Sequence, residues 1–249
     1  MPTGMAGPVP KLIVPLSEIG AECRGRRARV QVKLRQRAQA DAVRGPSASP
    51  DAADLAGTHA PYRSQGTTVP MPHLITASVR VHRSFLTAMA EFQAEGGGGP
   101  GDDSNTGQAI RKYASRWADP AEFARYVQQL EGEARDRSPR RGGRVPQTTL
   151  WWVSGDEYLG RISIRHRLTA HLREIGGHIG YDIRPSARQH GHATAMLAAA
   201  LPVARSLGID PALLTCDDDN IASRKVIEAN GGTLEDHRHG KARYWVSTF

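Results

Sequence analysis

A basic residue, a glycine and a run of small residues come together in IRPSARQHGHATAML, residues 183–197, where an apolar strand gives way to a helix. The first N–H groups of a helix lack intrahelical acceptors and carry a partial positive charge, so a turn that exposes them can bind an anion. Gly191 would let a phosphate approach the backbone, and the small side chain of Ala193 would not obstruct the first turn of the helix. Arg188 adds a positive charge. The stretch predicts a site for a phosphate-bearing ligand.

Two other groups of residues with metal-binding chemistry have the wrong spacing. In DDDNIASRKVIE, residues 217–228, acids stand at the first, third and twelfth positions of a calcium loop, but Ile221 is at the fifth and Ala222 replaces the glycine at the sixth. The first three acids instead complement the positive start of the next helix. No two histidines between positions 166 and 239 have the spacing of a zinc-binding helix with a carboxylate partner. We therefore expect no metal site.

The turn needs a strand before it and a helix after it. HIGYDIR, residues 178–184, predicts a strand that ends at Pro185, and the apolar face of the following segment predicts a helix from Gly191 to a stop at Gly208. A short buried strand at 212–216 and a helix at 220–230 should follow. Two final strands are expected at 233–236 and 242–247.

The preceding part of the chain predicts two helices and a hairpin. Apolar residues at intervals of three and four predict an amphipathic helix over 79–95, which the following glycine run ends. The glycine-rich residues 96–107 should form a flexible loop. Asp119, Pro120 and Glu122 are typical of the start of a second helix. The β-branched and aromatic segments 147–153 and 158–166 predict a hairpin.

Composition limits the class of protein. The chain has 249 residues, of which 39% are hydrophobic, so it can bury a core. No apolar run reaches the length of a membrane helix, and no apolar signal core is visible, so we expect a cytoplasmic protein without a membrane partner. Cys23 and Cys216 are too few for a disulfide framework, and we expect two free thiols.

Residues 1–65 differ from the rest in composition. They carry ten Lys or Arg against five Asp or Glu, and thus +5 of the net charge of +8, without a sustained hydrophobic period. We predict a disordered basic extension. CRGRRARVQVKLRQR would suit a nucleic-acid arm or an organellar presequence, but a solvated tail is favoured, so nucleic acid is an unfavoured partner. Translation from Met71 is a hypothesis that the intact mass of the native protein would test.

The segment RQHGHA, residues 188–193, resembles the arginine/glutamine-x-x-glycine-x-glycine/alanine signature of the GNAT superfamily of acetyl-CoA-dependent N-acetyltransferases. NIASRKVIEANGG, residues 220–232, resembles the family's asparagine-containing helix that ends in glycine. The resemblance covers roughly residues 74–246 and looks like a bacterial branch of predicted acetyltransferases. It implies an α/β (α+β) fold with a curved mixed, largely antiparallel sheet flanked by helices, in a domain over 74–249.

The resemblance also implies acetyl-CoA as cosubstrate. Its pyrophosphate would lie on the N–H groups of residues 189–194, its pantetheine arm would run beside the strand that ends at Ile183, and Asn220 would orient the pantetheine or thioester. Lys225 is a candidate for a CoA phosphate, although a solvated position is favoured. The implied cofactor-binding residues are Ile183, Arg188, Gln189, His190, Gly191, His192, Ala193, Thr194, Asn220, Ser223 and Lys225.

The implied reaction is direct attack in a ternary complex, with the thioester carbonyl polarised by an N–H group at or near Ile183. Family members often protonate the leaving thiolate with a tyrosine seven residues after the motif asparagine, where this chain has Ile227. Water, Tyr244 or Tyr181 could replace it, or the protein could be slow or inactive. His178 and Asp182 share one strand face and are candidate bases, although a structural role is favoured for each.

We thus expect an N-acetyltransferase that acetylates a primary amine. The acceptor, a small molecule or a peptide, would be selected by the first two helices, the loop 96–107 and the C-terminal strands. The alternative is a non-catalytic acyl-CoA-binding or sensor domain that kept the turn and lost its acid. A homodimer is a further hypothesis.

Overall fold

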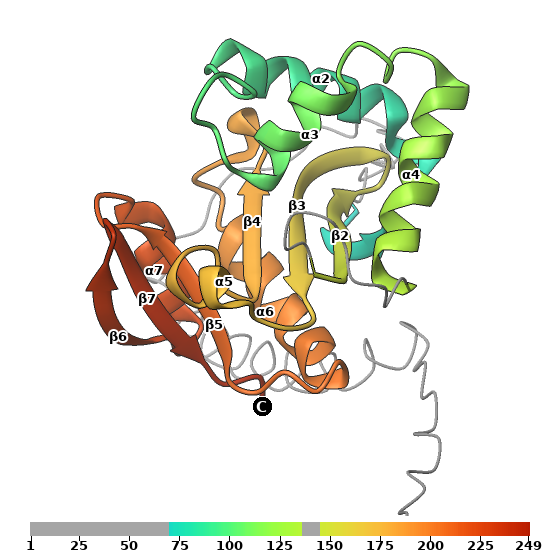
Figure 1. Cartoon of the computed structure of the whole chain (residues 1–249). Helices are drawn as coiled ribbons and strands as arrows, with labels where there is room; N and C mark the ends of the chain where they lie inside the picture. The colour runs from blue at the N-terminus through green and yellow to red at the C-terminus, as the bar shows by residue number, and fades with distance from the viewer. Residues whose placement is uncertain (1–69, 136–144) are drawn as a thin grey trace, which may run out of the picture. The chain divides into compact units, whose positions relative to one another are not determined.

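Seven strands form one sheet in the order β1-β2-β3-β4-β5-β7-β6 (Figure 1). The computed structural model describes residues 70–135 and 145–249, which belong to one compact unit. The strands are β1 (His73–Thr76), β2 (Gln147–Ser154), β3 (Glu157–Arg165), β4 (Ile179–Ile183), β5 (Ala212–Asp217), β6 (Thr233–Arg238) and β7 (Lys241–Val246).

Helices lie on both faces of this sheet. They are α2 (His82–Ala94), α3 (Asn105–Tyr113), α4 (Pro120–Arg135), α5 (Ala170–Glu174), α6 (His192–Ser206) and α7 (Ile221–Ala229). Short 3-10 turns at Val79–Val81 and Pro185–Ala187 precede α2 and follow β4. In Figure 1, α3 and α4 lie on the viewer's side of the sheet and α6 lies behind it.

Strand pairing is antiparallel throughout the sheet except between β4 and β5, which run parallel. The expected mixed, largely antiparallel sheet flanked by helices is therefore confirmed. The parallel pair has a single register contact, Ile179 with Leu214, whereas β5 and β7 pair over six residues. Strands β4 and β5 are thus joined only near the start of β4, and they separate beyond it.

Side-chain alternation along β3 gives the two faces different cores. Ile162 and Ile164 point to the α6 side, where they join a cluster with Met196 and Leu197 of α6. On the other face, Trp151 of β2 belongs to an aromatic cluster with Phe85 of α2, Phe123 and Tyr126 of α4, and Trp117 of the turn between α3 and α4. The side chains of β3 that alternate with the isoleucines, at positions 161, 163 and 165, are polar.

Helix starts and hairpin strands agree with the sequence patterns. Asp119 Oδ1 accepts hydrogen bonds from the N–H groups of Ala121 and Glu122, which is the predicted cap of α4. The hairpin of β2 and β3 lies where the aromatic and β-branched residues indicated. Gly208, with φ of +77°, stands just after α6 as predicted.

Three elements were not predicted. Strand β1 has four residues and α5 has five, which is too short for a hydrophobic period. Helix α3 overlaps the end of the loop expected over 96–107, because Ser104 Oγ accepts from the Gly107 N–H group and caps a helix with few apolar residues.

The structure bears on some of the predictions about cysteines, membrane helices and metal sites, but not on those for the N-terminal residues. The basic extension over 1–65 and Cys23 lie outside the described residues. Cys216 is a free, buried thiol. Within the described ranges, no helix is both long and apolar enough to cross a membrane, and no cluster of three or more His, Cys, Asp or Glu could hold a metal ion.

Candidate functional site

Strands β4 and β5 form a fork that is closed at one end. The His178 N–H group donates to the Leu213 carbonyl at 2.7 Å, and the Leu213 N–H group donates back to His178 Nδ1 at 2.9 Å. Gly177 has φ of +59°, and a Cβ atom there would lie 2.4 Å from the Leu213 carbonyl oxygen. Only glycine permits this approach. After Ile179 and Leu214, no further pair joins the two strands in the described residues.

Beyond this closed end, β4 offers main-chain groups to the fork. The Arg184 N–H group donates to Leu159 of β3 at 2.9 Å, so alternate residues direct their main-chain groups toward β3. The intervening residues, Tyr181 and Ile183, direct theirs toward β5. The Ile183 carbonyl accepts from Arg188 Nε at 3.2 Å, which leaves the Ile183 N–H group and Tyr181 at the open edge.

The turn between β4 and α6 exposes consecutive amides. Gln189 and Gly191 have positive φ angles of 65° and 75°, and the first helical bond runs from the Ala195 N–H group to Gly191 at 3.1 Å. Within the described residues, none of the N–H groups of 189–194 donates to a protein acceptor. A Cβ atom at Gly191 would meet nothing within 4 Å. The turn is therefore open to an anion.

Side chains around the turn hold its backbone in place. Arg188 forms an ion pair with Glu95 at 2.8 Å and lies over the Phe92 ring, so its guanidinium links the turn to α2. His192 Nδ1 accepts from Trp152 Nε1 at 3.3 Å, and burial lowers the pKa of His192. His190, Ala193 and Thr194 complete the turn: His190 is exposed, and the Thr194 carbonyl accepts from Asn230 Nδ2.

Helix α7 faces the fork from the β5 side. Asn220 Oδ1 accepts from the Ser223 N–H group at 3.0 Å and caps the helix, and its amide nitrogen makes no bond within the described residues. The Ser223 carbonyl accepts from the Tyr181 hydroxyl at 3.4 Å, so Tyr181 links β4 to α7. Burial raises the pKa of Tyr181 to about 12. Lys225 is exposed on the same helix.

Of the two candidate bases, His178 directly precedes β4 and Asp182 lies within it, and their surroundings differ. His178 Nδ1 is occupied by the Leu213 N–H group, and burial lowers the pKa of His178. Asp182 Oδ2 accepts from the Thr106 hydroxyl at 2.8 Å, and burial raises the pKa of Asp182. Thr106 comes from α3, the helix that the sequence patterns missed, and only the Ser104 cap could have indicated it.

Ile227, at the motif position of the thiolate acid, and Tyr244, one of its two candidate replacements, are both buried. Ile227 is 1% exposed within the core cluster and has no proton to donate. The Tyr244 hydroxyl donates to Glu228 Oε1 at 3.0 Å and accepts from Arg224 Nε at 3.1 Å. Both partners belong to α7, so the Tyr244 hydroxyl is already engaged.

Comparison with known proteins gives one family match. A family model described as an acetyltransferase (GNAT) domain matches residues 104–233, slightly more than half of the chain, including β4, the turn and α7. No curated protein matches the sequence.

Solved structures of similar fold are distant in sequence. Mycobacterium smegmatis RimJ in complex with CoA-disulfide is 18% identical, with 71% of this chain and 81% of that chain covered and a TM-score of 0.49. The Microcin C7 self immunity acetyltransferase MccE in complex with acetyl-CoA and AMP is 12% identical, with 71% of this chain and 92% of that chain covered and a TM-score of 0.46. The PaiA N-acetyltransferase of Thermoplasma acidophilum in complex with coenzyme A is 11% identical, with 71% of this chain and 99% of that chain covered and a TM-score of 0.43.

Proposed function

This chain belongs to the GNAT acetyltransferase family, and on that premise we propose that it transfers the acetyl group of acetyl-CoA to a primary amine by direct attack in a ternary complex. The observation that carries the proposal is the row of unbonded amides at 189–194, placed where the β4–β5 fork opens. We place the catalytic domain over residues 74–249. We also propose a cytoplasmic location.

The chain offers complementary groups to two parts of acetyl-CoA. The amides of 189–194 would receive the pyrophosphate, since a helix N-terminus favours an anion. The free edge of β4 at Tyr181 and Ile183 would bond the pantetheine arm as an added strand does. The amide nitrogen of Asn220 lies at the start of α7 and would donate to the same arm. In this arrangement Arg188 acts through Glu95 by fixing the turn.

The Ile183 N–H group at the fork is proposed to polarise the thioester carbonyl. Asp182 is proposed as the general base, directly or through one water, because its raised pKa brings the carboxylate closer to neutrality. His178 is the weaker candidate: its Nδ1 already accepts a bond that closes the fork. The amine nitrogen would bond to the acetyl carbon, lose its proton to Asp182 and expel the CoA thiolate.

Tyr181 is proposed to protonate the leaving thiolate. Its hydroxyl stays protonated at neutral pH, because its pKa is about 12, and it spans from β4 to the start of α7. It would thus supply from β4 the proton that Ile227 cannot supply from α7. Tyr244 is a poorer choice because Glu228 and Arg224 already engage its hydroxyl.

Calorimetric titration with acetyl-CoA of wild type and Gly191→Glu tests the proposal. The glutamate would place a carboxylate against the row of amides, and we expect affinity to fall about 100-fold. Gly208→Glu is the matched control, since Gly208 flanks the same helix with φ of +77° and equally open surroundings. It should lose folding stability as Gly191→Glu does, but keep its affinity for acetyl-CoA. Equal affinity of Gly191→Glu and wild type would refute the placement.

A further inference from the structure

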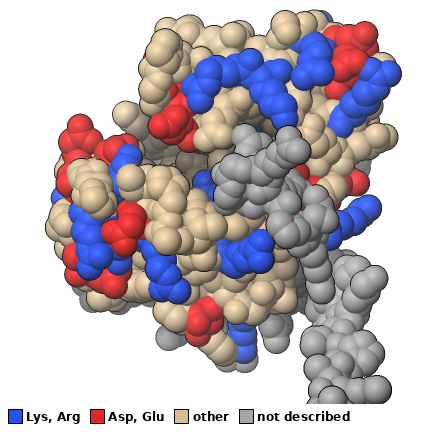
Figure 2. Space-filling view, in the orientation of Figure 1, with Lys and Arg blue, Asp and Glu red and all other residues tan. Residues whose placement is uncertain are grey.

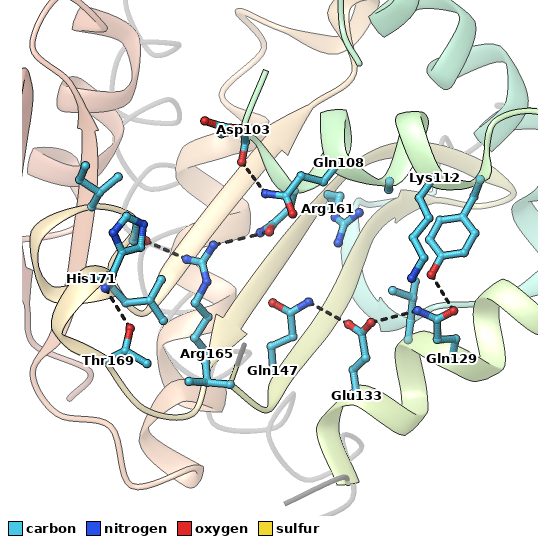
Figure 3. A pocket seen from close by; sticks show the side chains of 18 of the residues that line it. Asp103, Gln108, Lys112, Gln129, Glu133, Gln147, Arg161, Arg165, Thr169 and His171 are labelled. Atoms are coloured by element: carbon cyan, nitrogen blue, oxygen red, sulfur yellow. Dashed lines mark hydrogen bonds between the residues drawn. The ribbon is translucent and has the colours of Figure 1, made fainter. Parts of the chain in front are cut away.

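A polar cavity lies on the face of the sheet opposite α6. Its volume is about 650 Å³, which suits a small molecule, and it lies between β3, α3 and α4. The same face is hollowed in Figure 2, with Lys and Arg side chains gathered along its upper rim. The labelled side chains of Arg161, Arg165 and Glu133 point into this space in Figure 3.

Arg161 carries a buried charge that contacts no carboxylate directly in the described part of the chain. It is 5% exposed, and no Asp or Glu of the described residues forms an ion pair with it. Its Nη1 lies 3.5 Å from the Tyr126 hydroxyl, its Nη2 lies 3.3 Å from Ser163 Oγ, and its buried Nε has no partner in the described residues. Burial opposes this charge, but Asp182, which faces Arg161 across the β3–β4 pair, and Glu133 help to raise the pKa of Arg161. Its hydrogen bonds are nevertheless long and its Nε has none, so a bound anion would supply the acceptors that the described residues do not.

A second guanidinium strengthens the positive potential. Arg165 follows Arg161 by four residues on the same face of β3 and lines the same cavity. Its Nη1 donates to the carbonyls of Gly176 and Gly177, at 2.8 and 3.1 Å, and its Nη2 to Asn105 Oδ1 at 3.5 Å. None of these partners neutralises its charge. Burial and the charge of Arg161 both lower the pKa of Arg165.

The cavity also holds an acid that does not neutralise Arg161. Glu133 is 8% exposed and accepts from Gln147 Nε2 at 2.8 Å and Gln129 Nε2 at 3.2 Å. Glu133 forms no ion pair with Arg161 among the described residues, although its charge helps to raise the pKa of Arg161. The cavity therefore presents separate positive and negative groups to a ligand.

The cavity reaches β4 beside the fork. A Cβ atom at Gly180 would lie 3.5 Å from Asn105 Nδ2 and 3.8 Å from Arg165 Nη1, both of them cavity-lining residues. Gly180 directly follows Ile179, the last residue of β4 that pairs with β5. A ligand in the cavity would thus approach the fork from the face opposite α6.

We propose that this cavity binds the acceptor, and that the acceptor is a small amine bearing an anionic group, a carboxylate or a phosphate, which Arg161 receives with support from Arg165. This inference rests on the proposed function. The anionic end lies over β3, the amine points to Asp182 and the fork, and Glu133 is left to bind a donor group of the ligand.

Three amines of similar length separate the possibilities: ethanolamine, β-alanine and phosphoethanolamine. With acetyl-CoA, release of CoA thiol should show kcat/KM at least 10-fold higher for one anionic amine than for ethanolamine, and which of the two responds identifies the anion. Arg161→Met should abolish this preference without changing the affinity for acetyl-CoA. Acetyl-CoA binding without discrimination among the amines would overturn this inference alone, whereas absence of acetyl-CoA binding would refute the proposed function.

A thermal unfolding measurement tests the site without turnover. Because Arg161 faces the buried Asp182 across the β3–β4 pair, Arg161→Met should lower the Tm of the protein without ligand, and the ligand-induced shift is measured against that baseline. In the Gly191→Glu background, inorganic phosphate at ten times its Kd should raise the Tm by about 3 °C, and adding Arg161→Met should remove the shift. A phosphate shift that survives Arg161→Met would show that Arg161 does not bind the anion.

Discussion

Single residues in this chain decide which proton-transfer groups are available. The position where related enzymes often place a tyrosine holds Ile227, which is buried in the core. Tyr181, in contrast, has a proton to donate: it lies on β4, and its hydroxyl reaches the start of α7. Its residue type suggested a possible acid, but its contact with Ser223, 42 positions away in sequence, needed the structure.

Replacing Tyr181 tests the proposed acid. Tyr181→Phe should lower kcat for thiol release about 10- to 100-fold, because the leaving thiolate loses its proton donor. Its affinity for acetyl-CoA, measured by calorimetry, should stay within about twofold, since one weak hydrogen bond is lost. Tyr244→Phe is the matched control and should keep kcat. The reverse pattern, with kcat lost only in Tyr244→Phe, would assign the proton to β7.

At the level of elements, the sequence predicted the features that depend on a few neighbouring residues. It did not predict the features that depend on contacts between distant segments. The start of α6 at a glycine and the cap of α4 at Asp119 follow from rules that span a few residues. The fork does not, because its single pairing of Ile179 with Leu214 joins strands separated by a whole helix. The cavity was missed for the same reason: Arg161 and Arg165 look like ordinary polar positions of an alternating strand.

The start of α7 combines two roles that substitutions can separate. Asn220→Ser keeps a capping oxygen for the Ser223 N–H group but removes the amide donor, whereas Asn220→Ala removes both. Asn220→Ala should lower the free energy of unfolding by about 1 kcal/mol, and Asn220→Ser should change it little. Both should weaken acetyl-CoA binding about 10-fold if the amide bonds the pantetheine arm. Full affinity in Asn220→Ser would limit Asn220 to capping.

At the scale of the whole domain, one ion pair joins the first long helix to the strand that carries the site. Arg184, at the end of β4, donates from Nε and Nη2 to Glu91 of α2 at 2.8 and 2.6 Å. The Ser186 N–H group adds a bond of 3.1 Å to the same carboxylate. The hydrogen bond from Arg184 is the main reason that the pKa of Glu91 falls from 4.5 to about 2.

This ion pair should appear in the pH dependence of unfolding. Because the folded-state pKa of Glu91 is lowered, its stabilisation is complete above pH 4.5 and is lost as the pH falls to about 2. At pH 7, Glu91→Gln should reduce the free energy of unfolding by about 1–2 kcal/mol, since water partly screens the pair. The difference from wild type should shrink below pH 4.5 and vanish near pH 2.

Denaturant titrations across this pH range measure the effect, with Glu131→Gln as control. Glu131 pairs with Arg135 at 3.8 Å on the exposed side of α4, and its removal should cost little at any pH. A deficit in Glu91→Gln that persists unchanged at pH 2 would mean that the glutamine disturbs packing rather than charge.

In the proposed complex, residues 189–194 bind the pyrophosphate through main-chain N–H groups, which every amino acid except proline possesses. Mutation can therefore exchange the side chains of this turn, apart from the glycine that sets its bend, without deleting a single donor. Variants of this chain can therefore change the size and charge of the side chains around a ligand while keeping the main-chain donors that bind it. Sequence drift and conserved chemistry are compatible here because the two reside in different atoms.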